Sequence, residues 1–251
     1  MNLSNKVSLV TGGNRGIGKF ISLSLAEEGS SVAVHYNQDK KGAESVVKEI
    51  KEKGGNAEVF QADVSQRESV EKMVENCSKS LGQIDVLVNN ARQLVKGREF
   101  MELDWDKDYQ PHIDVMLKGT FNCCQVVMPS MIDRKNGRII NMLSTVIAES
   151  RPRTNSYGSI KSALFFFSKN LATEMGPHGI TVNMVSGGLL KVTDASAATP
   201  DEVFEAIAQM TPLQKVTTVK DLADAVVFFA SDASRAITGQ NLTVDGGLTF
   251  N

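Results

Sequence analysis

The sequence is poor in cysteine, histidine and tryptophan. Its 251 residues include 3 Cys, 3 His and 1 Trp. Cys77 and the adjacent pair Cys123 and Cys124 match neither a disulfide framework nor the paired C-x-x-C spacing of a zinc site. The three histidines are scattered along the chain, so no metal site is proposed. These absences exclude a disulfide-stapled secreted domain and predict a reducing compartment.

The chain also lacks an excess of basic residues and a long apolar run. It carries 27 Lys and Arg against 29 Asp and Glu, a net charge of −2, so we expect no nucleic-acid partner. The longest apolar runs, such as residues 163–167 and 225–230, fall far short of the ~20 residues that span a bilayer. The polar residues Ser4, Asn5 and Lys6 do not resemble an export signal. We therefore expect a cytoplasmic protein without a membrane partner.

What the sequence does contain is a regular alternation of short β-rich runs and longer segments of helical periodicity. Between the first two runs, Ile17, Ile21 and Leu25 recur every four residues before Gly29, which is typical of an amphipathic helix with a glycine C-cap. Single helices between strands require the strands to be parallel. The pattern predicts an α/β, doubly wound Rossmann fold, with helices on both faces of a seven-stranded parallel sheet. The expected strands are residues 7–10, 32–35, 57–61, 84–88, 138–142, 181–185 and 241–244.

No repeat or linker divides the chain, so we expect one dinucleotide-binding domain over residues 1–251. Capping-box patterns that begin at Ser65 and Thr199 predict two helix starts. A small, polar segment follows the sixth expected strand. We expect a substrate lid within residues 187–215.

A glycine-rich turn follows the first strand and opens into the first helix. Residues 11–18 read TGGNRGIG. Glycines let the backbone approach a pyrophosphate closely, and the helix N-terminus offers unpaired N–H groups. The context predicts a dinucleotide site formed by Gly12, Asn14, Arg15, Gly16, Ile17 and Gly18.

The end of the second strand indicates which dinucleotide binds. This strand runs into Asn37 without the acidic residue that holds a ribose 2′-hydroxyl in NAD enzymes. Arg15 in the loop, with Lys40 and Lys41 beyond the strand, supplies positive charge that suits a 2′-phosphate. We predict NADP (NADPH), with Asn37 in its site and Asp39 as the residue that opposes this choice. The alternative is that Lys40 and Lys41 only begin a solvated helix.

Three side chains suggest acid–base chemistry. Tyr157 and Lys161 are four residues apart, so a helix places them on one face. A free tyrosine has a pKa near ~10, and a neighbouring cation in a low-dielectric site can lower it. Ser144 follows the fifth strand, whose carboxyl end faces the ligand crevice in a doubly wound sheet. Ser144, Tyr157 and Lys161 are the candidate catalytic residues.

Taken together and in order, these motifs resemble the short-chain dehydrogenase/reductase family. The resemblance covers essentially the whole chain and includes residues 11–18, 63–64 and 89–91, the catalytic candidates, and residues 238–240 and 244–247. It implies that Asp63 and Val64 contact the adenine and Asn90 the adenosine ribose. It also implies a homotetramer, consistent with residues 164–167, which are apolar around the whole circumference of a helix.

For the reaction, the resemblance implies that Lys161 holds the nicotinamide ribose and lowers the pKa of Tyr157. Tyr157 then donates a proton, and Ser144 orients the substrate oxygen. The sequence most resembles reductases of 3-oxoacyl thioesters on acyl carrier protein. The expected activity is therefore NADPH-dependent reduction of a ketone to a secondary alcohol, on a small-molecule or carrier-bound acyl substrate.

Three positions depart from the family pattern. Arg92 stands where the family usually has glycine, Met116 where an asparagine normally supports a water that leads to the lysine, and Gly187 in a Ser-Gly-Gly run where Pro-Gly is usual. The Ser-Gly-Gly run favours an enoyl-thioester reductase as one alternative. Arg92 and Met116 favour another, a catalytically weak nucleotide-binding regulatory protein.

Overall fold

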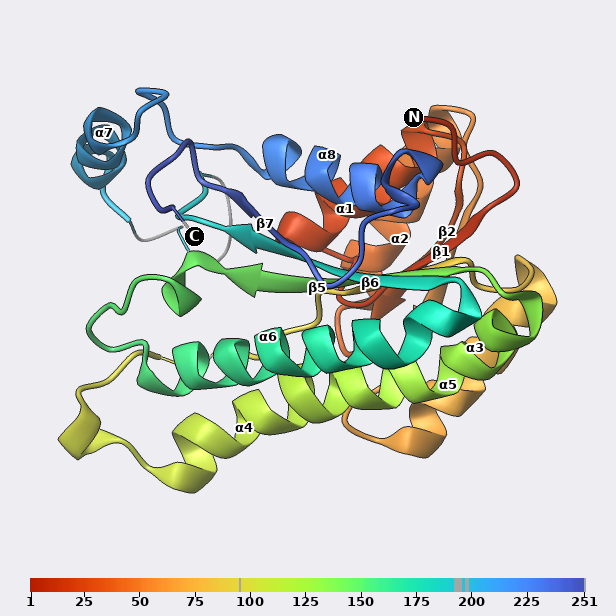
Figure 1. The fold of residues 1–251 in the computed structure, drawn as a ribbon, viewed down its shortest axis with the longest axis horizontal. Helices are drawn as coiled ribbons and strands as arrows, with labels where there is room; N and C mark the ends of the chain where they lie inside the picture. The colour runs from red at the N-terminus through yellow and green to blue at the C-terminus, as the bar shows by residue number, and fades with distance from the viewer. Residues whose placement is uncertain (95, 192–195, 197–198, 251) are drawn as a thin grey trace.

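A seven-stranded, wholly parallel sheet forms the centre of the protein (Figure 1). The computed structural model describes residues 1–94, 96–191, 196 and 199–250. The strand order is β3-β2-β1-β4-β5-β6-β7, so the winding reverses between β1 and β4. This confirms the predicted fold class. The strands are β1 Val7–Val10, β2 Ser31–Tyr36, β3 Ala57–Gln61, β4 Val86–Asn89, β5 Gly137–Ser144, β6 Ile180–Gly187 and β7 Asn241–Val244.

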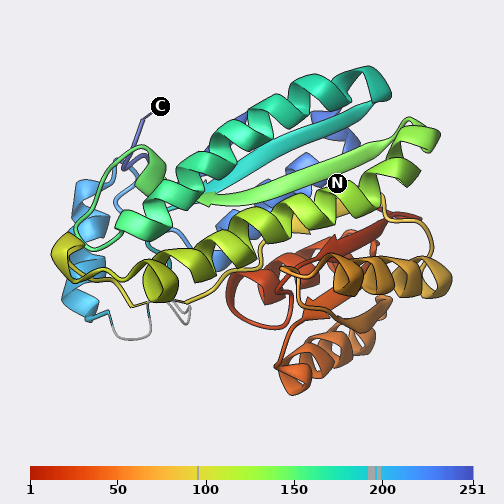
Figure 2. The same cartoon turned by 90° about the horizontal axis from the view of Figure 1, so that it is seen from below.

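Helices cover both faces of the sheet (Figures 1 and 2). One face carries α1 Gly16–Glu27, α2 Lys40–Glu52 and α8 Val219–Ala230, and the other carries α3 Arg67–Ser80, α5 Gly119–Arg134 and α6 Asn155–Met175. The short α4 Gln110–His112 lies between π-helical turns Trp105–Tyr109 and Ile113–Lys118, and α7 is Asp201–Met210. Four 3₁₀ turns are Phe100–Glu102, Thr145–Ile147, Gly176–His178 and Asp232–Ser234.

Strands β5 and β6 extend beyond the predicted ranges 138–142 and 181–185. Each has eight residues, and the two pair continuously from Gly137 and Ile180 to Ser144 and Gly187. The polar positions inside them find partners and stay in the ladder. The Asn141 amide donates to Ser168 Oγ at 2.8 Å, and the Asn183 amide donates to the Ile237 carbonyl at 2.8 Å. The carboxyl ends of β5 and β6 therefore reach past the apolar run to Ser144 and Gly187.

Helices begin close to where the two capping-box patterns predict, α3 at Arg67 and α7 at Asp201, but neither start is a capping box. Helices α3 and α7 begin without a side-chain cap, and the Ser65 hydroxyl instead donates to Asp63 Oδ1 at 2.7 Å. A capping box does occur at α8, where the Asp221 N–H donates to Thr218 Oγ1 at 3.2 Å and Asp221 Oδ2 accepts from the Thr218 N–H at 2.7 Å. Pattern alone does not show which local partner a serine or threonine takes.

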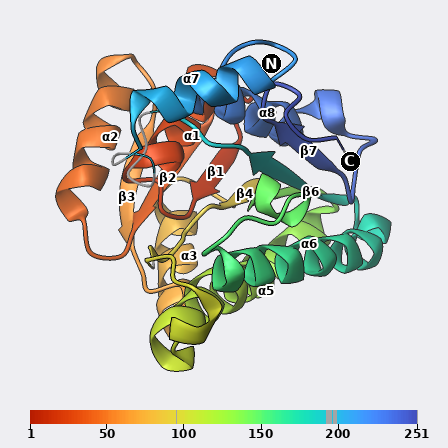
Figure 3. The same cartoon turned by 90° about the vertical axis from the view of Figure 1, so that its left-hand side faces the viewer.

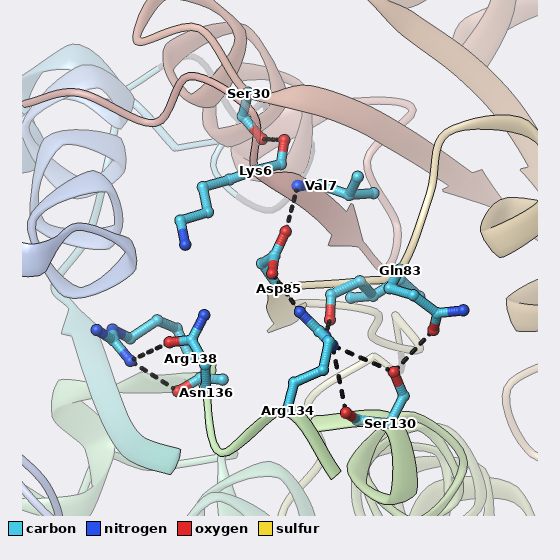
Figure 4. A network of polar contacts seen from close by, with 11 residues as sticks. Lys6, Val7, Ser30, Gln83, Asp85, Ser130, Arg134, Asn136 and Arg138 are labelled. Carbon is cyan, nitrogen blue, oxygen red and sulfur yellow. Dashed lines mark hydrogen bonds and ion pairs between the residues drawn. The ribbon is translucent and has the colours of Figure 1, made fainter. Parts of the chain in front are cut away.

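A polar network joins the amino ends of the strands to α5 (Figure 4). Asp85, just before β4, accepts from the Val7 N–H at 3.0 Å and pairs with Arg134 at 2.5 Å. The Arg134 guanidinium also donates to the Ile84 carbonyl at 2.6 Å. One carboxylate thus fixes the starts of β1 and β4 relative to the end of α5, at the edge of the sheet opposite to the carboxyl ends.

We expect Asp85→Ala to reduce the free energy of unfolding by about 2 kcal/mol, because it leaves the Val7 N–H and the guanidinium without their acceptor. The figure is moderate because the Arg134 side chain is 31% exposed and solvent screens the pair. Urea denaturation measures the loss. Glu75→Ala, which removes only a solvated pair with Lys79, is the control and leaves stability unchanged. A loss no greater than that of the control would contradict this structural role.

Candidate active site

A cavity of about 440 Å³ opens at the carboxyl ends of the strands, the edge that faces the viewer in Figure 3. It extends across the point between β1 and β4 where the winding reverses, which is where doubly wound sheets bind ligands. All the residues predicted for the site line this cavity. They are Gly12, Asn14, Arg15, Gly16, Ile17, Gly18, Asn37, Asp63, Val64, Asn90, Ser144, Tyr157 and Lys161.

The glycine loop has the form of a pyrophosphate cradle. Gly12 and Gly16 have φ values of 63° and 51°, a left-handed conformation that favours glycine. A Cβ at Gly18 would lie 2.0 Å from the Gly12 carbonyl oxygen, so only glycine fits there. Helix α1 begins with no side-chain cap and no acidic residue in its first turn, so its N–H groups are available to an anion. The residues present therefore fit a dinucleotide.

His35 of β2 holds this loop in place, a role that sequence analysis missed. Its Nδ1 accepts from the Gly12 N–H at 2.9 Å, and its Nε2 lies 3.0 Å from the Ala62 carbonyl. Because a backbone N–H can only donate, the Nε2 carries the proton and donates to Ala62. The neutral ring joins the glycine loop to the segment that leads into Asp63. Burial lowers the pKa of His35 to about 4. A polar residue in the otherwise apolar run 32–36 was the available signal.

Thr11 and Asn90 lock the loop after β4 against the loop after β1. Thr11 Oγ1 accepts from the N–H groups of Asn90 and Ala91 at 2.9 and 3.0 Å. The Asn90 side-chain amide donates to the carbonyls of Thr11 and Gly12 at 3.0 and 3.1 Å. The nitrogen of this amide therefore supports the glycine loop.

Near the end of β2, Asp39 is held by hydrogen bonds. Its Oδ1 accepts from the Gly42 N–H at 2.9 Å and its Oδ2 from the Asn14 amide at 3.0 Å, and these bonds lower the pKa of Asp39. Arg15 borders the cavity, but Lys40 and Lys41 are not among its lining residues. They lie in the first turn of α2, as the solvated-helix alternative supposes.

Tyr157 and Lys161 share one face of α6, with Lys161 Nζ 5.6 Å from the centre of the tyrosine ring. Lys161 donates to the Met142 carbonyl at 2.6 Å, and burial, with the nearby Arg92 charge, lowers its pKa to about 7. Burial raises the pKa of Tyr157, while the Arg92 charge and a hydrogen bond with Ser144 act to lower it. Burial is the largest of these influences on the Tyr157 pKa, and the role that the resemblance gives to Lys161 stays a prediction.

The three departures from the family pattern lie in different surroundings. Met116 is 1% exposed in an apolar cluster with Leu143, Ile160, Leu164 and Met184, and it does not border the cavity. Arg92 and Gly187 do border it. Residues 192–195 and 197–198 of the predicted lid lie outside the described residues.

Known proteins resemble this chain over almost its whole length. A family model described as enoyl-(acyl carrier protein) reductase matches residues 12–249. A 3-oxoacyl-[acyl-carrier-protein] reductase FabG of Staphylococcus epidermidis is 40% identical, with 97% of this chain and 99% of that protein covered. The reductase of the same name from Thermotoga maritima is 35% identical, with 100% of both chains covered. A solved structure of a gluconate 5-dehydrogenase from Burkholderia cenocepacia, with NADP and tartrate, matches with a TM-score of 0.91 and 29% identity, covering 98% of this chain and 96% of that one.

The fold, the glycine cradle and these matches define an oxidoreductase built on a single Rossmann sheet. The chain belongs to the short-chain dehydrogenase/reductase family. Within that family, the relatives reported above that cover the chain at 35–40% identity are 3-oxoacyl-[acyl-carrier-protein] reductases.

The pH dependence of folding tests the role of His35. Its folded pKa of about 4 lies below its ordinary value of 6.5, so between these values the unfolded chain binds a proton that the folded chain does not. Stability therefore falls as the pH drops from 6.5 to 4, by up to about 3 kcal/mol. We expect His35→Asn, which keeps an acceptor but cannot titrate, to flatten this slope in urea denaturation. His178→Asn, outside the loop, is the matched control. An unchanged slope in His35→Asn would contradict the assignment.

Proposed function

We propose that the protein reduces the ketone of a 3-oxoacyl thioester to a secondary alcohol with NADPH. The observation that carries the proposal is that Ser144, Tyr157 and Lys161 meet in the same cavity as an uncapped glycine cradle. The names of the relatives support a thioester substrate, because these names state a 3-oxoacyl chain on an acyl carrier protein.

The side chains supply the proton and its orientation. A bound nicotinamide would supply a hydride for the carbonyl carbon, and the Tyr157 hydroxyl supplies the proton for the oxygen, so ketone, hydride and proton together give the alcohol. The raised pKa keeps Tyr157 protonated, which is the state a proton donor needs. Ser144 and Tyr157 line the same cavity, so two hydroxyls are available to one substrate oxygen. Lys161, held by the Met142 carbonyl, is placed to bind the nicotinamide ribose.

The same cavity supports NADPH as the cofactor. Asn14, Arg15 and Asn37 line its adenosine end, where both oxygens of Asp39 are already engaged by the Asn14 amide and the Gly42 N–H. The Burkholderia structure contains NADP, which is consistent with this choice. Asp63 and Val64, which line the cavity, would contact the adenine, as the family resemblance implies.

Reduction of an enoyl thioester is the second candidate, favoured by the description of the matching family model. It requires a hydride on an alkene carbon rather than on a carbonyl. The paired hydroxyls of Ser144 and Tyr157 suit a carbonyl oxygen that gains negative charge as hydride arrives. This geometry favours ketone reduction.

We further propose a homotetramer in the cytoplasm, with residues 187–215 as the substrate lid. Phe121 of α5 and Phe166 of α6 lie on the same face of the sheet and are 43% and 64% exposed, which suits a face covered by another subunit. Gly187 and Gly188, at the base of the lid, border the cavity. Among the described helices, none is long and apolar enough to cross a membrane.

A pair of thioesters tests the reaction. We expect NADPH consumption with acetoacetyl thioester and much slower consumption with crotonyl thioester. Tyr157→Phe removes only the proton donor, so kcat falls by about 10³-fold while NADPH affinity, measured by fluorescence, is retained. Faster turnover of the crotonyl thioester, or a Phe variant at the wild-type rate, would refute the proposal.

Arg15 tests the choice of cofactor. We expect Arg15→Ala to weaken NADPH binding by roughly tenfold, about 1.4 kcal/mol, and to leave NADH binding unchanged, because only NADPH carries the 2′-phosphate. Lys40→Ala is the matched control, since this cation does not line the cavity. Equal losses of affinity for NADPH and NADH would mean that Arg15 contacts a part of the dinucleotide that both cofactors share, and would contradict the contact with the 2′-phosphate.

A further inference from the structure

Arg92 is a half-buried cation in the catalytic end of the cavity. It borders the same space as Ser144, Tyr157 and Lys161. Its charge also lowers the pKa values of both Tyr157 and Lys161, the groups that line this cavity with it. A ligand held by Arg92 therefore lies next to the reacting carbonyl.

The backbone that carries Arg92 is fixed. The two residues before it donate their N–H groups to Thr11 Oγ1 at 2.9 and 3.0 Å, and the Asn90 amide donates to two carbonyls of the glycine loop. The guanidinium therefore extends from a rigid base. Side chains that start from a fixed backbone lose less entropy when they bind a ligand.

No carboxylate of the protein neutralises this cation in the part of the chain that the structure describes. Arg92 has neither an ion pair nor a side-chain hydrogen bond with the described residues. The carboxylates that line the described cavity are Asp39 and Asp63, and both are bonded at the adenosine end, to Asn14 and Gly42 and to Ser65 respectively. The catalytic end thus combines positive charge with hydroxyl groups.

We propose that Arg92 is a specificity-determining residue that binds a carboxylate next to the reacting ketone, so that the enzyme also reduces short 3-oxo carboxylates. This inference rests on the proposed ketone reduction and extends its substrate class from thioesters to free oxo acids. A guanidinium binds a carboxylate through two parallel hydrogen bonds and retains its charge when partly buried. We place the carboxylate one or two carbons from the ketone, because Arg92 and Tyr157 line the same cavity.

A substrate with a carboxylate also reduces the repulsion between the charges of Arg92 and Lys161. Unoccupied, the Arg92 charge disfavours a protonated Lys161, whose pKa is about 7. A bound carboxylate cancels that charge and favours the protonated lysine. An anionic substrate thereby offsets the cost of holding two cations in one cavity, whereas a neutral substrate does not.

Two substrates of matched skeleton test the inference. Acetoacetate carries the carboxylate, and methyl acetoacetate has the same ketone with a neutral ester. We expect Arg92→Gln to reduce kcat/KM for acetoacetate, mainly through KM, by at least about tenfold more than it reduces the value for the ester, because the ester shares only the effect of the charge on the reacting ketone. Arg92→Lys should restore part of the preference. Lys96→Gln, an exposed cation four residues further along that does not line the cavity, is the control.

Calorimetric binding of acetoacetate to the protein loaded with oxidised cofactor separates this inference from the proposed reaction. Binding that Arg92→Gln abolishes, together with no turnover of acetoacetate, methyl acetoacetate or the acetoacetyl thioester, supports the carboxylate site and refutes the ketone reduction. Turnover of both substrates with the same ratio in wild type and Arg92→Gln overturns the role of Arg92. Absence of both binding and turnover of acetoacetate overturns it as well.

Discussion

The site depends on hydrogen bonds that tie the glycine loop to the strands on either side of it. From β2, the His35 ring accepts the Gly12 N–H and reaches the Ala62 carbonyl. From the loop after β4, Asn90 bonds to two loop carbonyls. The sheet order places β1 between β2 and β4, so both supports reach the same four-residue strand and its loop. A loop held on both sides keeps its left-handed glycines aligned toward an anion without help from the ligand.

The sequence patterns that predicted the fold and the site well are those set by local chemistry. The apolar strands, the glycine run and the four-residue spacing of Tyr157 and Lys161 each reflect a period or a turn within one element. The patterns that failed involve a choice among distant or competing partners. Ser65 bonds to Asp63 rather than capping α3, Lys40 and Lys41 stay on α2, and His35 acts through two residues far away in sequence.

Burial has opposite consequences for the two reacting groups of α6. Desolvation disfavours a charged lysine and a charged tyrosinate alike, so it lowers one pKa and raises the other. Both effects favour an uncharged pair in the empty cavity. Met116 adds to the burial of this region, because it belongs to the apolar cluster that includes Ile160 and Leu164 of α6. A thioether at this place offers neither a strong acceptor nor a path for water.

The charged side chains that line the two ends of the described cavity differ. The adenosine end carries both signs, with Asp39, Asp63 and Arg15, whereas the end with the hydroxyls carries the cations Arg92 and Lys161. A cofactor held at the uncapped start of α1 would leave this cationic end to the substrate. Hydride transfer to a ketone builds negative charge on its oxygen, and a site whose nearby charges are positive stabilises that change most. Arg92 stands where the family usually has glycine. Its guanidinium therefore adds a positive charge to the part of the cavity where the reduction of a ketone develops a negative one.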